Sequence, residues 1–339
     1  MDPSVEIVEF TPTPEQYAWT FGGAAPVMAV RPGTALRLWS DDAFCGRLRS
    51  TADLPSASLR MPFVNPQTGP FFVEGAQPGD TLVLHLAELT PARDWGASSL
   101  IPFFGGLTST DRTATLQPPL PERTWIYALD RAAGTVAFES SDGAFTHPLP
   151  LEPMLGTVGV APAAGEVRAA LVPDVFGGNM DTPEMRAGTT VYLRVNVEGA
   201  LFSLGDGHYR QGEGESCGTA VEGAMTSLVL VDLIKGSASG GGPAWPRLES
   251  DEHWSVVGSA RPLEDAWRAG QVDAVRWLQQ LHDLDELDAY QLLSQVSEVP
   301  LANAVDVNYS VTTKLPKRLL PAASAYQGTH ERLRALARG

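Results

Sequence analysis

The segment Pro78-Gly79-Asp80-Thr81-Leu82-Val83-Leu84-His85-Leu86 shows the pattern that decides the fold class. A turn signal precedes six residues, five of which have apolar or β-branched side chains, and this is typical of a strand entered from a tight turn. Residues 191–197 follow Ala187-Gly188 in the same way. Short runs of this kind, separated by Gly, Pro and Asp, continue to about residue 235. The sequence therefore predicts that strands dominate the chain.

Length and composition restrict the class of protein further. Of 339 residues, 43% are hydrophobic and 19% are charged, which excludes a disordered or fibrous protein. Forty acidic against 24 basic residues give a formal net charge of −16, which opposes binding to nucleic acid and to anionic membranes. No apolar run approaches the roughly 18 residues that span a bilayer. The first ten residues have neither a basic region nor an apolar region, so we expect no secretion signal. Cys45 and Cys217 lack CxxC spacing and suit a reducing compartment, so we expect a cytoplasmic protein.

The periodicity changes near residue 240. Beyond it, apolar residues recur at helical spacing within residues 262–282 and 285–299, which predicts a helical pair that covers the sheet. The nearly continuous apolar run from Thr219 to Ile234 fits either kind of element. We expect a short helix around Val221 there, followed by a strand. The fold class expected from the whole chain is α+β and β-rich.

We expect one β-rich domain followed by a surface tail. The tail is predicted because Lys, Arg and Pro are frequent from Lys314 onward. The expected divisions are a single domain (1–320), with an N-terminal sheet portion (1–150), a central catalytic portion (151–240) and a helical portion (241–320), and then the C-terminal tail (321–339).

Residues 198–222 carry the densest set of chemically active groups. If the strand through Phe202 continues, Asp206 and His208 lie two residues apart and project to the same side. A carboxylate and an imidazole placed in this way suit one metal ion or one water. The alternative is a solvated hairpin whose acids cap turns. The apolar run that begins near Glu222 favours the site, because carboxylates beside a core need a partner.

Other positions allow a functional and a structural interpretation. Gly177 and Gly178 can form a rigid turn that presents Asn179 and Asp181, or Asp181 can start a helix after an ordinary Asx turn. Glu74 ends an apolar strand and is either a site acid or an edge charge. His85 alternates with leucines on its strand and could point toward a site.

Four long motifs follow one another along the chain. The first begins Asn65-Pro66-Gln67-Thr68-Gly69-Pro70, and the third reads Gly177-Gly178-Asn179-Met180-Asp181-Thr182. In order and approximate spacing the motifs resemble the acetamidase/formamidase family of amide hydrolases, from about residue 10 to residue 320. Shorter stretches near residues 94–107 and 288–294 agree. The four motifs occupy residues 65–80, 153–162, 177–182 and 197–219.

The resemblance implies hydrolysis of a short aliphatic amide, such as acetamide or formamide, to a carboxylate and ammonia. It implies a cytoplasmic enzyme of layered β/α/β architecture, with mostly antiparallel sheets, that assembles as a homodimer or larger oligomer. It also implies a divalent metal, zinc or calcium. Phe176 stands where many relatives have a histidine, and Tyr209 and Arg210 replace small residues. An altered pocket that accepts a cyclic amide is therefore an alternative expectation.

Amide hydrolysis assisted by a metal ion suggests a role for each candidate residue. We expect Asp206 and His208 to be metal or water ligands, with Asp181 as a third, and Asp206 thereby takes part in catalysis. Two carboxylates and an imidazole fit zinc better than calcium, which prefers more oxygens. Glu222 is the expected general base. The alternative bases are Glu198, Glu213 and Glu215.

The expected substrate-binding residues are Asn179, Gly178, Phe176 and Cys217. Two rival functions stay open. Cys217 could be the nucleophile of a cysteine amidase, activated by a nearby base. Alternatively, the chain is a non-catalytic binding protein on the same scaffold. The expected partner is a small amide, with neither nucleic acid nor a membrane.

Overall fold

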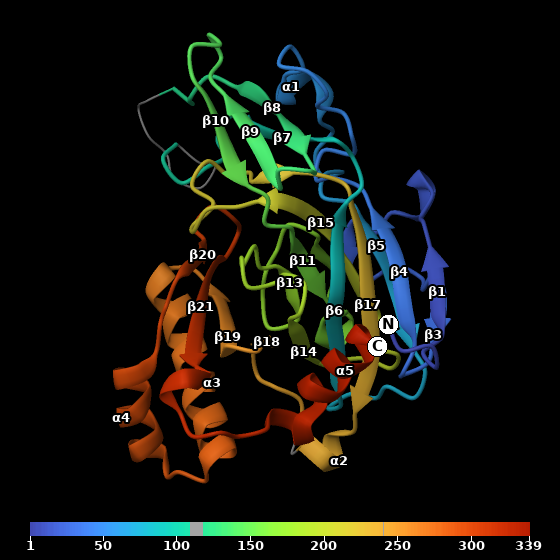
Figure 1. The fold of residues 1–339 in the computed structure, drawn as a ribbon, viewed down its shortest axis with the longest axis vertical. Coiled ribbons are helices and arrows are strands. Elements are labelled where there is room, and N and C mark those ends of the chain that lie inside the picture. The colour runs from blue at the N-terminus through green and yellow to red at the C-terminus, as the bar shows by residue number, and fades with distance from the viewer. Residues whose placement is uncertain (109–117, 240) are drawn as a thin grey trace.

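The structure is a computed structural model of the chain, and it describes residues 1–108, 118–239 and 241–339. Two large sheets dominate it (Figure 1). Among the pairs of named strands, β1 (Ile7–Phe10) with β4 (Ala35–Ser40) and β3 (Met28–Val30) with β5 (Gln67–Val73) run parallel, and the others run antiparallel. The predicted β-rich class with mostly antiparallel sheets is confirmed.

The first sheet has nine strands in the order β1, β4, β17, β6, β14, β18, β19, β21, β20, and the second has ten. A small third sheet pairs β2 (Thr20–Phe21) with β12 (Arg168–Ala169). The remaining strands of the first sheet are β17 (Met225–Ile234), β6 (Thr81–Pro91), β14 (Thr190–Arg194), β18 (Arg247–Glu249), β19 (His253–Ala260), β21 (Tyr309–Pro316) and β20 (Leu301–Asn303). Those of the second are β10 (Thr146–Pro150), β9 (Thr135–Glu139), β8 (Arg123–Asp130), β7 (Trp95–Leu100), β16 (Val221–Glu222), β15 (Phe202–Arg210), β11 (Met154–Gly159) and β13 (Gly177–Asn179), to which β5 and β3 are joined.

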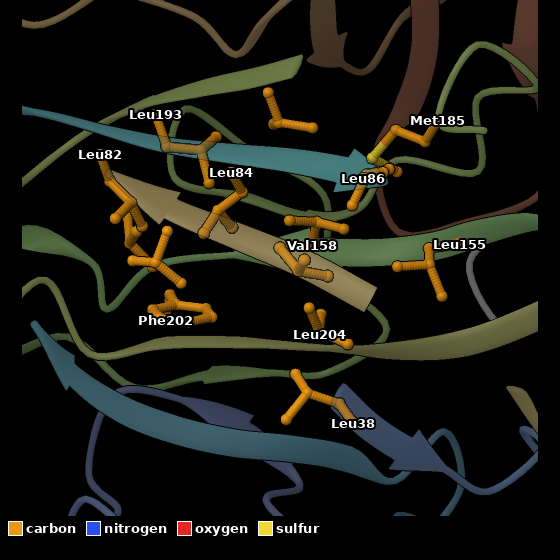
Figure 2. Packing of buried hydrophobic residues seen from close by; sticks show 14 of the residues in the cluster. Leu38, Leu82, Leu84, Leu86, Leu155, Val158, Met185, Leu193, Phe202 and Leu204 are labelled. Carbon is orange, nitrogen blue, oxygen red and sulfur yellow. The ribbon is translucent and has the colours of Figure 1, made fainter. Parts of the chain in front are cut away.

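The main hydrophobic core lies between the two large sheets. Leu82, Leu84 and Leu86 alternate along β6 and point into this core, where they meet residues of the second sheet such as Val158 and Phe202 (Figure 2). The period of two residues is the strand pattern that the sequence predicted. Because the core joins the sheets directly, strands of the second sheet are held rigidly where the candidate site lies.

The predicted helical pair is present as α3 (Leu263–His282) and α4 (Glu286–Val296). Both cover the outer face of the first sheet, where Trp254 of β19 and Leu315 of β21 pack with residues of α3 (Figure 1). The helical layer therefore lies outside the sheets and not between them, since the inner faces of both sheets are apolar and pack together. Shorter helices are α1 (Pro55–Ser58) and α2 (Gly236–Ser239), with 3₁₀ turns η1 (Pro14–Gln16), η2 (Ala163–Gly165), η3 (Lys317–Leu319) and η4 (Ala325–Gly328).

The expected surface tail contains helix α5 (Thr329–Arg338), which packs on β6. Leu333 and His330 are each 1% exposed. His85, on the face of β6 opposite the leucines, lies 2.9 Å from the Thr190 hydroxyl, which lies 2.9 Å from His330 Nδ1. His85 therefore helps to hold α5 on the sheet and does not join the candidate site. Within the described residues, no helix is long and apolar enough to cross a membrane.

The helix expected around Val221 is wrong. Val221 and Glu222 form strand β16, which pairs with β15 on one side and with β7 on the other. A short apolar run that is buried on both faces has the same sequence pattern in a helix and in a strand. Here the backbone hydrogen bonds to the two neighbouring strands stabilise the strand.

Candidate metal centre

Strand β15 supplies the first two candidate ligands. Asp206 and His208 lie two residues apart, and His208 Nε2 is 3.5 Å from Asp206 Oδ1. Both side chains are buried. His208 Nδ1 contacts the side-chain oxygen of Gln211 at 2.9 Å, so Nε2 is the nitrogen directed at the carboxylates. The structure thus brings together the two residues that the strand pattern paired.

A tight turn after β13 supplies Asp181. Gly178 has a φ of +89°, and a Cβ there would lie 2.2 Å from the Val172 carbonyl oxygen, so this position requires glycine. Asp181 has a φ of +46° and begins no helix. Its carboxylate joins Asp206 and His208 in a group whose ligand atoms all lie within 4.8 Å of one another. Gly178 therefore lets β13 lie close to the Val172 carbonyl, directly before the turn that carries Asp181.

Glu222 reaches the same histidine from β16. Its Oε1 accepts a hydrogen bond from the Ala220 backbone N–H at 2.8 Å, and its Oε2 lies 3.1 Å from His208 Nε2. Burial, only partly offset by His208, raises the pKa of Glu222 to about 7. A carboxyl group with a pKa near neutrality is suited both to accept a proton and to return it.

Of the three alternative bases, only Glu215 lies in the cluster. Its carboxylate, Glu222 and His208 place their ligand atoms within 4.8 Å of one another, and burial raises the pKa of Glu215 well above its usual range. Glu198 lies at the surface, 3.5 Å from Gln77. Glu213 is exposed and is not among the residues grouped with His208. The site therefore contains two glutamates that can carry a proton.

The side chain of Asn179 forms hydrogen bonds with four other side chains around the site. Its Nδ2 donates to Asp181 Oδ2 at 2.7 Å and to Asp306 Oδ2 at 2.8 Å. Its Oδ1 accepts from Asn65 Nδ2 at 2.6 Å and from the Thr157 hydroxyl. Both hydrogens and both lone pairs of the amide are thus used. Among the described residues these contacts leave the amide no free donor or acceptor for the expected contact with substrate, and one of them holds the Asp181 carboxylate.

Sequence reasoning missed several residues of this network. Asn65 and Thr157 lie within two of the motifs that carried the family resemblance, so the sequence held a signal for them. Asn65 Nδ2 lies 3.3 Å and the Thr157 hydroxyl oxygen 3.2 Å from Asp206 Oδ2. Gln211 donates to the Asp181 carbonyl oxygen at 2.6 Å. Asp306 had no local signal, because only the fold brings it to Asn179. Burial raises the pKa of Asp306 to about 7.

The cluster holds more buried negative charge than its own residues neutralise. Asp181 Oδ1, Asp206 Oδ1 and Glu222 Oε2 are buried, and none has a hydrogen-bond partner in the described part of the chain. The contact between His208 and Glu222 is short but lacks hydrogen-bond geometry. Burial raises the pKa of Asp181 well above its usual range, and the neighbouring acids raise it further. Because unpaired buried charge is costly, a cation would stabilise this arrangement.

The shape of the cluster also fits a small cation. A Cβ on Gly156 of β11 would lie 2.5 Å from Asp181 Oδ1 and 2.6 Å from Asp206 Oδ2, so glycine lets this strand approach the carboxylates. Two donors, each about 2.1 Å from a tetrahedral ion, lie about 3.4 Å apart. The distance of 3.5 Å from His208 Nε2 to Asp206 Oδ1 matches this spacing. The residues present therefore fit a divalent metal ion.

Phe176 does not line the site, which corrects the expectation of substrate contact. Its ring is buried in the core against Phe21, with 5.4 Å between ring centroids. Tyr209 is also fully buried and packs against Gly223, while Arg210 donates to Glu152 at 3.0 Å near the surface. None of these three side chains belongs to the cluster around His208, so they give no reason to expect an altered pocket.

Cys217 and Glu74 also lie away from the cluster. Cys217 is an exposed free thiol that contacts the Thr219 carbonyl oxygen at 3.2 Å, and it is not among the residues grouped with His208. Glu74 forms a surface ion pair with Arg31 at 3.4 Å, which supports the interpretation as an edge charge. The geometry gives the cysteine mechanism no base at hydrogen-bond distance among the described residues.

The buried position of Phe176 leads to a prediction about stability. Phe176→His should destabilise the protein by about 2–4 kcal/mol, because a buried ring is exchanged for a smaller polar one without a partner. Urea unfolding measures this loss, and the relative rates with different amides should stay unchanged. Full stability together with altered relative rates would show that Phe176 lines the pocket after all.

Comparisons with known proteins point to one family. A family model described as the Acetamidase/Formamidase family matches residues 144–320. A crystal structure of an acetamidase from Yersinia enterocolitica superimposes with a TM-score of 0.87 at 39% identity, and the match covers 94% of each chain.

Two sequence relatives have names of the same kind. The acetamidase of Mycolicibacterium smegmatis is 28% identical over 263 residues, which cover 61% of this chain and 63% of the relative. The formamidase of Methylophilus methylotrophus is 28% identical over 257 residues, covering 62% of each chain. The matches thus span less than two thirds of the length of these two relatives.

Proposed function

The chain belongs to the acetamidase/formamidase family, and from this premise we propose that it hydrolyses the C–N bond of a small linear amide to a carboxylate and ammonia. The relatives named acetamidase and formamidase support this reaction and a small substrate. The observation that carries the proposal is the buried group of Asp181, Asp206 and His208 beside Glu222. Amide hydrolysis needs an activated water, a stabilised oxyanion and a protonated leaving group.

Asp181, Asp206 and His208 would hold a divalent metal. Zinc is favoured over calcium, because calcium takes six to eight oxygen ligands and an imidazole is typical of zinc. Such a metal, when bound, polarises a carbonyl and lowers the pKa of a water molecule. Asn179 keeps the Asp181 carboxylate in place through its hydrogen bond of 2.7 Å.

Glu222 transfers the protons in this proposal. Its Oε1 accepts a hydrogen bond from the Ala220 N–H, while Oε2 lies 3.1 Å from His208 Nε2 and has no hydrogen-bond partner among the described residues. Oε2 takes a proton from the attacking water and gives it to the amide nitrogen, which then leaves as ammonia. With the pKa raised to about 7 by burial, Glu222 is suited to both steps near neutral pH.

A panel of amides tests this function. Purified protein, supplied with zinc, should release ammonia from formamide, acetamide or propionamide at a rate that saturates with substrate. Each reaction is compared with a chelator-treated sample and with the relevant amide in buffer. A lactam that is opened while all linear amides fail would favour the cyclic-amide alternative. No turnover of any amide, with metal bound, would favour a binding protein.

We further propose that the protein forms a homodimer through the outer face of α3 and α4. Trp267, Val272, Leu287 and Tyr290 are 45–75% exposed and line a groove of about 310 Å³. Exposed apolar patches of this kind mark interaction sites. Arg276 on α3 and Glu286 on α4 also line the groove, so a two-fold copy can oppose unlike charges.

Light scattering tests this assembly. The measured mass of the protein in solution should be about twice the 36.2 kDa of one chain. Leu287→Glu should reduce the mass to that of one chain, because a charge would be buried in the interface. A monomeric parent protein, or a variant that stays dimeric, would contradict the proposed face.

We also propose a cytoplasmic location. Cys45 and Cys217 are both free thiols, as is usual for proteins of a reducing compartment. Cell fractionation tests this, and recovery of the protein mainly outside the cytosolic fraction would contradict it.

A further inference from the structure

We infer that Tyr209 is the positioning residue that holds Glu222 against His208, an inference that rests on the proposed role of Glu222. Tyr209 is fully buried and directly follows His208 on β15. The same short stretch of strand thus carries a candidate ligand and, in the next residue, the contact that fixes the proton carrier.

A bulge in β15 creates the place for this side chain. His208 pairs with Glu222 and Arg210 pairs with Val221, so Tyr209 is the extra residue between two successive pairs. Bulges of this kind redirect a side chain and interrupt the regular ladder. Because β16 has only two residues, its backbone pairing alone gives Glu222 little support.

The ring of Tyr209 fills the space that two glycines leave open. A Cβ on Gly223 would lie 2.3 Å from Tyr209 Cε1 and Cζ, and a Cβ on Gly96 of β7 would lie 3.3 Å from Cδ2. Gly223 follows Glu222 directly, and Ala97, next to Gly96, pairs with Glu222. The ring therefore packs beside the backbone on both sides of the glutamate.

The hydroxyl of Tyr209 fixes the end of this segment. It donates a hydrogen bond to the Ala224 carbonyl oxygen at 2.9 Å and accepts one from the Arg93 backbone N–H at 3.2 Å. The ring and the hydroxyl together fix the position of residues 222–224 relative to His208. A displacement of about 1 Å at this point is enough to reduce catalysis strongly.

The first test compares two buried tyrosines. Tyr209→Leu should lower kcat 10-fold to 100-fold, with KM and bound zinc unchanged, and Tyr209→Phe, which keeps the ring, should restore most of the loss. The control is Tyr192→Leu, because Tyr192 is equally buried and its hydroxyl donates to Glu249 at 2.8 Å. This control should lower stability and leave kcat unchanged. A kcat for Tyr209→Leu equal to that of the parent would overturn the inference.

Gly223→Ala provides a second test, because its effect on kcat should have opposite signs in the parent protein and in the Tyr209→Leu variant. In the parent protein the new Cβ would collide with the ring of Tyr209, so kcat should fall at least 10-fold. In the Tyr209→Leu background the blocking ring atoms are absent, and the same substitution should raise kcat by filling part of the space. Equal losses in both backgrounds would contradict a clamp between these two residues.

Hydrogen exchange supplies a readout that needs no amide turnover. In metal-free protein, Tyr209→Leu should raise exchange at the amides of residues 220–224 at least 10-fold, while Tyr192→Leu should leave them unchanged. Unchanged exchange in Tyr209→Leu would overturn the inference. A local rise in exchange, with a parent protein that hydrolyses no amide, would uphold the clamp and refute the proposed function instead.

Discussion

His208→Ala is expected to remove bound metal and amide hydrolysis together. Among the described residues the imidazole is the one nitrogen donor of the proposed metal site, and Nε2 lies within 3.5 Å of carboxylate oxygens of both Asp206 and Glu222. Without it, the remaining carboxylates repel one another in a buried site. Zinc measured by atomic absorption after dialysis should fall at least 10-fold, and ammonia release should fall in the same samples.

Two further variants make this result interpretable. His85→Ala removes a histidine that is equally buried but lies beneath α5, and it should keep both metal and activity. His208→Gln keeps a polar side chain in case the alanine variant does not fold. Normal metal content in folded His208→Gln protein, with normal turnover, would show that His208 is not a ligand.

Glu222→Gln should keep the metal and reduce turnover roughly 100-fold to 10,000-fold, the usual contribution of a positioned acid or base. Glutamine has nearly the same shape but cannot accept a proton from water. Stopped-flow or steady-state ammonia release measures kcat, and the same samples are analysed for metal. Glu249→Gln, which changes a buried glutamate that binds Trp254 and Lys317, is the matched control and should leave kcat unchanged.

The outcome for Glu222 also separates two assignments within the cluster. Loss of metal in Glu222→Gln would make Glu222 a ligand, a role that its distance of 3.1 Å from His208 Nε2 would allow. Glu215 would then be the base, because it is the alternative glutamate that the fold brings to His208. Full activity in Glu222→Gln would rule out the proton-transfer role.

Local pattern predicted much of the fold. Alternation along residues 81–86 predicted β6, and helical spacing in residues 262–282 predicted α3. Local pattern failed where tertiary contacts determine the secondary structure. Val221 is in a strand because β7 and β15 flank it. Helix α5 was missed because its charged sequence resembles a tail, although Leu333 packs into a small core.

The residues of the candidate site also fall into those that local sequence pattern could predict and those that depend on tertiary contacts. Asp206 and His208 could be paired from the sequence, since two residues of one strand share a face. The role of Asn179 could not, because it depends on four partners that lie far apart in sequence, including Asp306. Phe176 was expected to contact substrate because many relatives have a histidine at this position, whereas its ring packs in the core.

The central claim is that one divalent metal at Asp181, Asp206 and His208 supports amide hydrolysis. Titration of zinc into metal-free protein, with ammonia release from the best amide measured at each point, tests it most directly. The rate should rise in proportion to added zinc, reach a plateau at one ion per chain, and stay at background in Asp206→Asn protein. Full activity of the metal-free protein would contradict the account.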